Sequence, residues 1–366
     1  MKTKARIIAM YLPQYHPIPE NDKYWGKGFT EWTNVAKARP LFHGHYQPHI
    51  PADLGFYDLR LPEMREAQAE LARDAGIEGF CYYHYWFGNG KMLLQKPFEE
   101  VLRLGKPDFP FCLCWANHDW TTKTWVKGNS VVNNPMIAKQ EYPGEEDYIR
   151  HFEYCLPAFK DHRYIRIENK PVFVIYAPLD IPNVNDFINR WNVLAKENGF
   201  DGIYFIGMKG GRQSSYQMII NLGFDGVCNN NRWEAEALAS GSRLKRRIQT
   251  LLGWHLGVSL MKFDYENVVK NYNTTENKIE NCYPVITPGF DRTPRAGKRA
   301  TIYVNSTPGK FGEHVKAVCE NIKDKDDEHK VIFLIAWNEW GEGNYMEPDL
   351  KWGHGYLEAL KSAIKE

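Results

Sequence analysis

The chain has 366 residues, a formal net charge of +1 and 25% charged residues. This length suits one large domain or two medium ones, and the balanced charge provides no overall field that would attract nucleic acid or an acidic partner. Aromatic residues make up 14%, with 12 Trp and 21 Tyr. Such a content is typical either of an aromatic-rich core or of exposed rings that stack on the apolar faces of sugars.

Short apolar or β-branched runs recur along the chain and predict strands, and most are followed by segments with apolar residues at spacings of three and four, which predict helices. The predicted strands are Arg6–Leu12, Gly79–Tyr85, Phe109–Trp115, Pro171–Tyr176, Gly202–Met208, Gly226–Asn229, Tyr283–Thr287 and Val331–Trp337. The predicted helices are Leu61–Ala75, Pro97–Leu104, Glu145–Phe159, Val184–Asn198, Gln213–Leu222, Lys310–Ile322 and Gly355–Ile364. This alternation predicts an α/β fold, a (β/α)8 barrel in which residues 1–366 form a single catalytic domain.

Three long loops follow predicted strands, near residues 13–59, 117–145 and 230–281. In a barrel, these loops lie at the carboxyl ends of the strands, where such enzymes keep their active sites, so we expect them to build a deep cleft. The chain has no GxGxxG segment and no Walker loop, which disfavours an open nucleotide-binding sheet.

Polar and aromatic residues gather where the predicted strands end, and we expect them to meet at one rim. The candidates for substrate binding at these ends are Tyr11, Gln14, His84, Trp86, Trp115, Asn117, Trp120, Tyr176, Trp233 and Asn338. Any single residue of this kind is more often part of the core than of a site, but convergence from several strands favours a site. Among them, Trp86, Trp115, Trp120 and Trp233 are predicted to form sugar-stacking subsites.

The last predicted strand leads directly to two carboxylates, Glu339 and Glu342, which lie among Trp337, Trp340 and glycines. The alternative is an exposed loop with two solvated glutamates. Carboxylates at a strand end and bounded by tryptophans are typical of a walled pocket, so we predict a catalytic acid pair. The chain has no GxSxG elbow, which disfavours acyl transfer by a serine nucleophile.

Seven cysteines, an odd number, include several within predicted strands, which predicts reduced, buried thiols. Cys112 and Cys114 lack the two-residue spacer of a redox or zinc pair. The apolar stretch over residues 7–12 is too short for the core of a signal peptide and is followed by Pro13. We therefore expect no signal peptide, no membrane-spanning helix and a cytoplasmic location.

Two further segments have competing interpretations. His43, His45 and His49 invite a metal site, but their Pro- and Gly-rich surroundings and the lack of a nearby acidic cluster favour a polar loop whose histidines bond neighbours or substrate. We expect neither a metal nor a cofactor. Residues 243–260 combine a basic cluster with apolar residues; a helix packed on the barrel is favoured over one that contacts anionic lipid.

Six segments together resemble the WbsX-like proteins of bacterial surface-polysaccharide loci, which are related to glycoside hydrolase family 99. They are Ile8–His16, Gly28–Asn34, Gly44–Pro48, Asp53–Leu59, Cys114–Asn117 and Trp337–Gly343. The resemblance implies a (β/α)8 barrel of the endo-α-mannosidase type, an oligosaccharide or polysaccharide substrate, and substrate contacts at Glu31 and Trp32.

The family 99 pattern Asn-Glu-Trp-His-Glu-Gly resembles Asn338–Gly343. By this resemblance, Glu339 matches the carboxylate thought to deprotonate the substrate 2-hydroxyl, and Glu342 matches the general acid/base. The chain departs at Gly341, where family 99 has His, so the substrate contact near that His is not carried over. A route through a 1,2-anhydro sugar requires the 2-oxygen trans to the leaving group, which restricts the substrate to the α-manno or α-rhamno configuration.

Two other functions remain open at the level of the sequence. WbsX-like proteins have long been labelled glycosyltransferases, and a transferase in lipopolysaccharide or capsule biosynthesis would need a nucleotide-diphosphate site, for which the chain offers neither a convincing Asp-x-Asp nor a Gly-rich first turn. A glycan-binding module would keep the aromatic residues but would have no reason to keep both carboxylates. We therefore expect a glycoside hydrolase.

Overall fold

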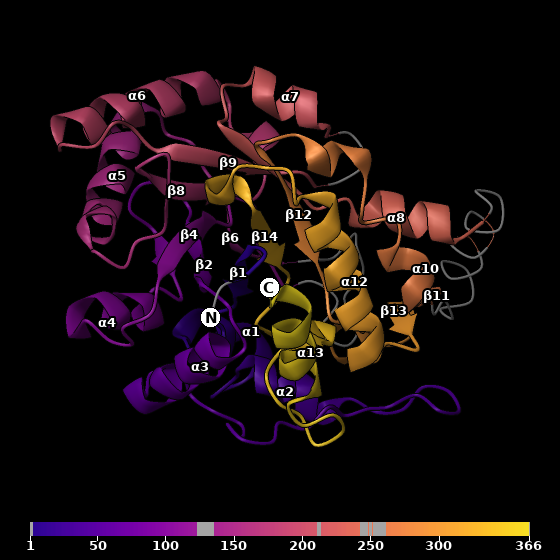
Figure 1. Ribbon diagram of the computed structural model, residues 1–366. Helices are drawn as coiled ribbons and strands as arrows, with labels where there is room; N and C mark the ends of the chain where they lie inside the picture. Colours follow the sequence, from indigo (N-terminus) through magenta and orange to yellow (C-terminus); the bar gives the residue numbers. More distant parts are fainter. Residues whose placement is uncertain are drawn as a thin grey trace.

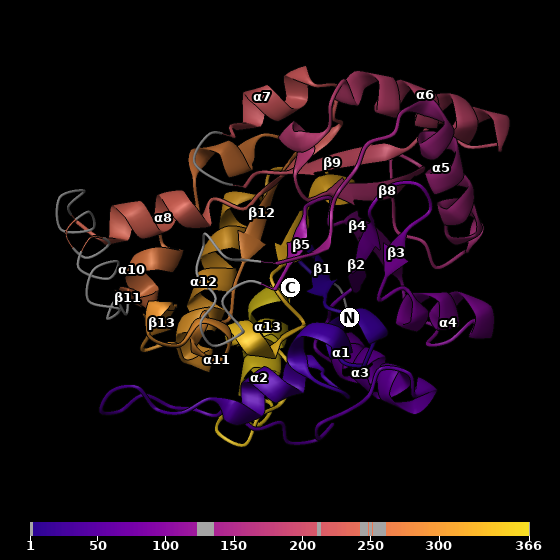
Figure 2. The same ribbon diagram turned by 180° about the vertical axis from the view of Figure 1, so that it is seen from behind.

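A computed structural model describes residues 3–122, 135–210, 214–241 and 261–365, together with Ile248 and Leu251. Within these residues, eight parallel strands pair in the order β1-β14-β12-β10-β9-β8-β4-β2, and β2 pairs with β1 again, so that the sheet closes on itself (Figures 1 and 2). The strands are β1 (Arg6–Tyr11), β2 (Gly79–Trp86), β4 (Phe111–Trp115), β8 (Lys170–Ile175), β9 (Tyr204–Met208), β10 (Gly226–Asn229), β12 (Cys282–Ile286) and β14 (Val331–Leu334). The predicted (β/α)8 barrel is confirmed.

The strands are buried because their apolar runs face the barrel interior on one side and the helices on the other. Every residue of β4, β9, β10, β12 and β14 is buried. The first and last strands pair in register, with Ile7 opposite Ile332 and Ala9 opposite Leu334. Near them the two ends of the chain also meet, where the Lys4 N–H donates to the Ile364 carbonyl at 2.8 Å.

Helices surround the barrel, as Figures 1 and 2 show from opposite sides. The outer helices are α3 (Pro62–Asp74), α4 (Lys96–Leu104), α5 (Glu145–Lys160), α6 (Val184–Glu197), α7 (Tyr216–Asn221), α12 (Pro308–Asn321) and α13 (Gly355–Ile364). Each overlaps a predicted helix. Their buried faces carry the apolar spacing of three and four, as in Val184, Phe187, Ile188 and Trp191 of α6.

The long loops carry small elements of their own. They contain α1 (Pro19–Trp25), α2 (Glu31–Lys37), β5 (Trp120–Thr121), β6 (Met136–Ala138), α8 (Arg232–Ala239), β11 (Met261–Asp264) and α10 (Tyr265–Val269). Further short elements are β3 (Met92–Leu93), β7 (Arg166–Ile167), α11 (Thr293–Ala296) and β13 (Thr301–Val304). The predicted helix at 243–260 lies outside the described residues, apart from Ile248 and Leu251.

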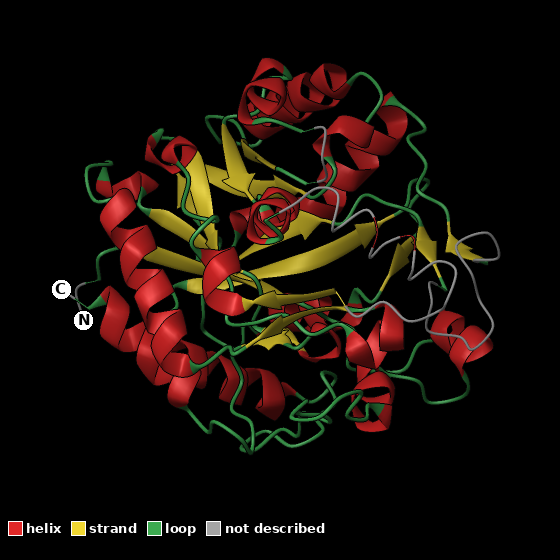
Figure 3. Cartoon of the chain, turned by 90° about the vertical axis from the view of Figure 1, so that its right-hand side faces the viewer, coloured by secondary structure: helices red, strands yellow, loops and turns green. Residues whose placement is uncertain are grey.

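The seven cysteines are free and buried, which confirms the prediction of reduced thiols in the core. Burial raises the pKa of thiols such as Cys155 and Cys228, so these groups are protonated. Among the described helices, none is long and apolar enough to cross a bilayer. The two termini lie together on one side of the barrel (Figure 3).

Candidate active site

The two predicted catalytic carboxylates lie on a tight turn that follows the last barrel strand. Glu339 ends the short strand β15 (Asn338–Glu339), which pairs with β16 (Asn344–Tyr345), and Glu342 ends the 3-10 turn between them (Trp340–Glu342). Gly343 closes the turn at φ +55°, a conformation that suits glycine. Both carboxylate side chains are partly exposed, at 12% for Glu339 and 22% for Glu342.

Two cavities meet at this carboxylate pair. The larger has a volume of about 670 Å³ and the smaller about 130 Å³, and both are lined by Tyr83, Tyr176, Glu339 and Glu342. The other lining residues come mainly from the carboxyl ends of the strands and the segments that follow them. In the larger cavity they include Asp180, Met208, Asn230, Arg232, Trp233, Tyr272, Thr287, Phe290 and Tyr303. In the smaller cavity they include Leu12, Gln14, Tyr85, Ala116, His118, Trp120 and Arg295.

A buried arginine links the two carboxylates. Arg295 Nη2 lies 2.8 Å from Glu339 Oε2, and Arg295 Nη1 lies 2.8 Å from Glu342 Oε1. Its Nε donates to Glu31 Oε1, also at 2.8 Å. Burial opposes the charge of Arg295, but the three carboxylates outweigh burial and raise its pKa well above the ordinary value. The guanidinium therefore holds two like charges side by side, and it favours their ionised forms.

Hydrogen bonds fix this turn to the first barrel strand. The Asn338 side-chain amide accepts from the Leu12 N–H at 2.7 Å and donates to the Leu12 carbonyl at 3.0 Å. The Tyr15 hydroxyl donates to the Asn338 carbonyl and accepts from the Trp340 N–H. Asn338 is fully buried, so it acts as a clamp between the ends of β1 and β14.

The buried carboxylate of Glu347 is hydrogen-bonded to the turn that carries Glu339 and Glu342. Glu347 accepts hydrogen bonds from the Trp340 indole, the Tyr57 hydroxyl and the Gln68 amide. Burial raises the pKa of Glu347 to about 7, although these hydrogen bonds act in the opposite direction. Its proton is therefore held more tightly in the folded chain than in the unfolded one.

This raised pKa predicts a pH dependence of stability. Between pH 4.5 and about 7 the folded chain keeps a proton on Glu347 that the unfolded chain has lost, so this residue's contribution of about 3 kcal/mol is present below that range and lost as the pH rises through it. The free energy of unfolding, measured by urea titration at pH 5 and pH 7.5, should fall more for the wild type than for Glu347→Gln. An equal fall in both would contradict the assignment.

The structure brings six of the predicted site residues to the cavities: Gln14, Trp120, Tyr176, Trp233, Glu339 and Glu342. The Gln14 Nε2 atom is buried and has no hydrogen-bond partner among the described residues. Tyr176 and Trp233 are the most exposed of the six, at 38% and 37%. These residues form the set for which substrate contacts are proposed below.

The other predicted substrate-binding residues lie in the interior and line neither cavity. They are Tyr11, Glu31, Trp32, His84, Trp86, Trp115, Asn117 and Asn338. Several point toward the outer helices: the Tyr11 hydroxyl donates to Gln68 of α3, and the Trp86 indole donates to Asp147 of α5. The Asn117 amide bonds both the N–H and the carbonyl of Ala177, which joins the ends of β4 and β8. We propose no stacking role for Trp86 and Trp115, because their rings are packed in the core.

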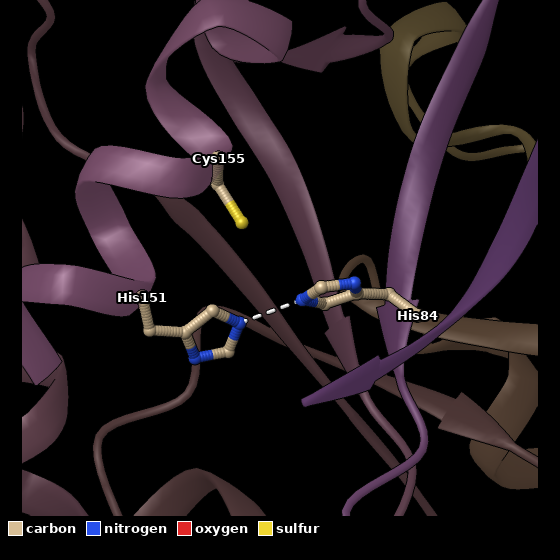
Figure 4. A group of neighbouring side chains, drawn as sticks. All are labelled: His84, His151 and Cys155. Atoms are coloured by element: carbon tan, nitrogen blue, oxygen red, sulfur yellow. Dashed lines mark hydrogen bonds between the residues drawn. The ribbon is translucent and has the colours of Figure 1, made fainter. Parts of the chain in front are cut away.

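His84 belongs to a buried group that has the chemistry of a metal site. Donor atoms of His84, His151 and Cys155 lie within 4.8 Å of one another, the one such group found among the described residues. Figure 4 shows the two imidazoles facing each other, and their Nε2 atoms are 2.8 Å apart. Burial lowers the pKa of His84 to about 3 and that of His151 well below its ordinary value, so one neutral ring donates to the other. This hydrogen bond satisfies both nitrogens without an ion.

Two of the three candidate histidines of the first long loop, His45 and His49, have protein partners. His45 Nε2 lies 2.8 Å from Asp291 Oδ2, and His49 Nδ1 lies 2.6 Å from the Tyr345 hydroxyl. The hydrogen bonds to neighbours that were predicted for this polar loop are therefore present for His45 and His49.

Sequence reasoning missed Arg295, which contacts both carboxylates. Arg295 lies eight positions after the predicted strand Tyr283–Thr287, and this place after a barrel strand is the signal in the sequence that indicates it. The segment also contributes the Asp291 N–H, which donates to the Glu342 carbonyl at 2.6 Å.

Comparison with solved structures shows which folds are similar. The chain superposes on a "glycoside hydrolase-like protein" with a TM-score of 0.60 at 15% identity, covering 99% of this chain and 94% of that one. It superposes on the GH99 endo-alpha-mannosidase from Bacteroides thetaiotaomicron in complex with bis-tris-propane with a TM-score of 0.58 at 15% identity, covering 98% and 96%. At this identity the similarity establishes the barrel fold alone.

Sequence comparison identifies relatives. Two proteins named "Uncharacterized protein WxcX", from two strains of Xanthomonas campestris pv. campestris, are 33% and 32% identical over 365 residues. The alignment covers 98% of this chain, which spans about half the length of these relatives. A family model described as "Glycosyltransferase WbsX" matches residues 7–360. The chain therefore belongs to the WbsX family, as the six motifs predicted.

Proposed function

We propose that this chain is a glycoside hydrolase that cleaves α-manno- or α-rhamno-configured glycans, with Glu342 as general acid/base and Glu339 assisting through the substrate 2-hydroxyl. The observation that carries the proposal is the pair of adjacent, partly exposed carboxylates at the junction of two cavities. Glycosidic cleavage needs one carboxyl group that protonates the leaving oxygen and a second that assists at the anomeric centre. The barrel shared with an endo-alpha-mannosidase agrees with this chemistry.

The shape of the site favours cleavage within a glycan rather than at its end. Because both cavities reach Glu339 and Glu342, a bound glycan has room on each side of the bond that lies next to the carboxylates. The unpartnered Gln14 amide in the smaller cavity provides a donor for a sugar hydroxyl. The physiological setting that we propose is the metabolism of bacterial surface polysaccharide.

Trp233 is expected to provide a stacking platform in the larger cavity. Trp233 is 37% exposed, and the Arg232 guanidinium lies 5.0 Å from the centroid of its ring, which holds the ring in place. Trp233→Ala should weaken glycan binding by about 1–3 kcal/mol in isothermal titration calorimetry, with little change in melting temperature. Trp115→Ala is the matched control, since this buried ring should lower the melting temperature instead. A loss of stability in Trp233→Ala without loss of binding would exclude the platform.

Glu339 is expected to act on the 2-hydroxyl, with no covalent bond to the sugar. A 2-deoxy or 2-fluoro α-mannoside with a good leaving group should therefore fail to react, because the internal nucleophile is missing. The alternative is direct attack by Glu339 on the anomeric carbon, which would leave the sugar bound to the protein. Intact-protein mass spectrometry distinguishes the two: a sugar adduct on Glu339 would rule out the 1,2-anhydro route.

A glycosyltransferase is the second candidate, and the printed name of the family model favours it. The chain has one Asp-x-Asp, Asp324-Lys325-Asp326, but it lies between α12 and the start of β14, at the amino end of a barrel strand. Glu339 and Glu342 follow the carboxyl end of the same strand, so this Asp-x-Asp cannot serve the same cavities.

The deciding experiment is incubation with α-manno- and α-rhamno-configured oligosaccharides without any nucleotide sugar. Release of shorter oligosaccharides, lost in Glu339→Gln and Glu342→Gln, supports the hydrolase. Glycan extension that requires a nucleotide sugar would establish the transferase instead. Binding without turnover in either assay would indicate a glycan-binding protein.

A further inference from the structure

A third carboxylate lies beneath the catalytic turn and takes no part in the proposed chemistry. Glu31 is the first residue of α2, and its side chain is fully buried. Its Oε1 accepts from Arg295 Nε at 2.8 Å and from Asn34 Nδ2 at 3.3 Å, while its Oε2 has no hydrogen-bond partner among the described residues. A buried, ionised carboxylate is costly unless a charge of opposite sign compensates it, and Arg295 provides that charge for Glu31.

The catalytic turn leaves space for this carboxylate at Gly341. A Cβ atom on Gly341 would lie 1.9 Å from Glu31 Oε1 and 2.8 Å from Arg295 Nε. Gly341 is not among the glycines with positive φ, so the requirement is for space and not for an unusual backbone conformation. The family 99 pattern has His at this place. In this chain, a carboxylate that comes from α2 occupies the region where that side chain would begin.

The presence of Glu31 beside Arg295 affects the protonation of the catalytic pair. With Glu339 and Glu342 alone, the guanidinium would stabilise the ionised forms of both catalytic groups. General acid catalysis requires a proton on Glu342 when the substrate is bound. A third carboxylate on the same guanidinium offsets part of its positive charge and so makes that proton easier to hold.

We propose that Glu31 is a positioning residue, which fixes Arg295 beneath the catalytic turn and offsets its charge, and thereby sets the pH range in which Glu342 carries a proton. The catalytic consequence rests on the proposed function, whereas the electrostatic effect on Glu342 does not.

Other charged and titratable groups also face the catalytic pair. Arg292 Nε lies 3.3 Å from Glu342 Oε1, and further groups line the two cavities. The charged and titratable residues around the pair are Arg232, Arg292, Arg295, Glu339, Asp180, His118, Tyr83, Tyr85, Tyr176, Tyr272 and Tyr303. All of these residues are retained in variants at position 31, so a difference between such variants reports on Glu31 and on its contact with Arg295.

The test measures the titration of Glu342 directly, by carboxyl ¹³C NMR of protein labelled at glutamate, with Glu342→Gln to assign the resonance. Glu31→Gln removes one negative charge and should lower the titration midpoint of Glu342 by about one pH unit. Glu31→Asp keeps the charge and should stay close to the wild type. An unchanged midpoint in Glu31→Gln, or an equal shift in Glu31→Asp, would overturn the proposal.

A second variant removes the same charge with less disturbance of packing. In Glu31→Ala combined with Gly341→Ala, the new methyl group at 341 enters the space that the carboxylate leaves. The same downward shift of the Glu342 midpoint is expected, and its absence counts against the proposal even if Glu31→Gln fails to fold.

The kinetic test uses an aryl α-mannoside. Both limbs of the pH profile of kcat/KM should move to lower pH in Glu31→Gln, since less negative charge surrounds both catalytic groups. Glu31→Asp keeps the charge and should have the pH profile of the wild type. If the wild type cleaves neither α-mannosides nor α-rhamnosides, the proposed function fails, while the NMR titration still decides the role of Glu31.

Discussion

Glu342→Gln is expected to lower kcat/KM on an α-mannoside with a poor leaving group by about 10²–10⁴-fold, because the amide cannot protonate the departing oxygen. The loss should be much smaller on an aryl α-mannoside whose leaving group needs no proton, and glycan binding should persist. Steady-state kinetics on the two substrates, with calorimetry for binding, measure these effects.

The control for this prediction is Glu320→Gln, which changes an exposed glutamate on α12 by the same chemistry and should leave both rates unaltered. Equal losses on the two substrates would show that Glu342 does not act as the acid. The ion pair with Arg295 adds a requirement, since Glu342 must gain a proton despite a guanidinium 2.8 Å away.

Gly341→Ala is expected to have the second large effect, on both stability and turnover. The added methyl group would lie 1.9 Å from the Glu31 carboxylate, so the turn, the carboxylate or Arg295 must move. Overpacking of this kind costs about 1–3 kcal/mol, and displacement of Arg295 would also misplace both catalytic groups. Urea unfolding and kcat on an aryl α-mannoside measure the two losses.

Gly309→Ala is the matched control, because Gly309 lies in α12 with nothing within 4 Å of the position of a new Cβ. That variant should be neutral or slightly stabilised. Combining Gly341→Ala with Glu31→Ala should restore part of the unfolding free energy, since the clash is removed. Strictly additive losses would show that Glu31 and Gly341 do not compete for the same space.

The fold could be predicted because each barrel strand is a continuous apolar run bounded by polar or turn residues. The carboxyl ends of the strands were predicted less accurately. In β14 the apolar run continues through Ile335, Ala336 and Trp337, but the strand ends at Leu334. Ala336 and Trp337 are buried all the same, so burial extended further than the pairing of the strand.

The sequence did not reveal which face of each strand a candidate residue occupies. Side chains alternate along a strand, and on β2 the residues Tyr83 and Tyr85 line the cavities while His84 and Trp86 face α5. The same alternation separates Leu12 in the smaller cavity from Tyr11, which bonds to α3. This alternation explains why several candidates are buried while their neighbours in the sequence line the cavities.

Arg295 and Glu31 were not predicted as partners because their contact depends on closure of the barrel. They are 264 positions apart in the sequence, and Arg295 is 44 positions from Glu339. No local pattern links such residues, whereas Glu339 and Glu342 share one turn and follow a strand directly.

The Asn338 clamp on Leu12 has a consequence for how the candidate site is assembled during synthesis. The clamp joins positions 326 residues apart, and the Glu31–Arg295–Glu339 contacts likewise unite early and late segments. A nascent chain whose strand β14 is still inside the ribosome therefore has neither a closed seam nor Glu339 and Glu342 in place. Because contacts of such high sequence separation form only when the first and last strands of the barrel meet, closure of the barrel is also the step that assembles the candidate site.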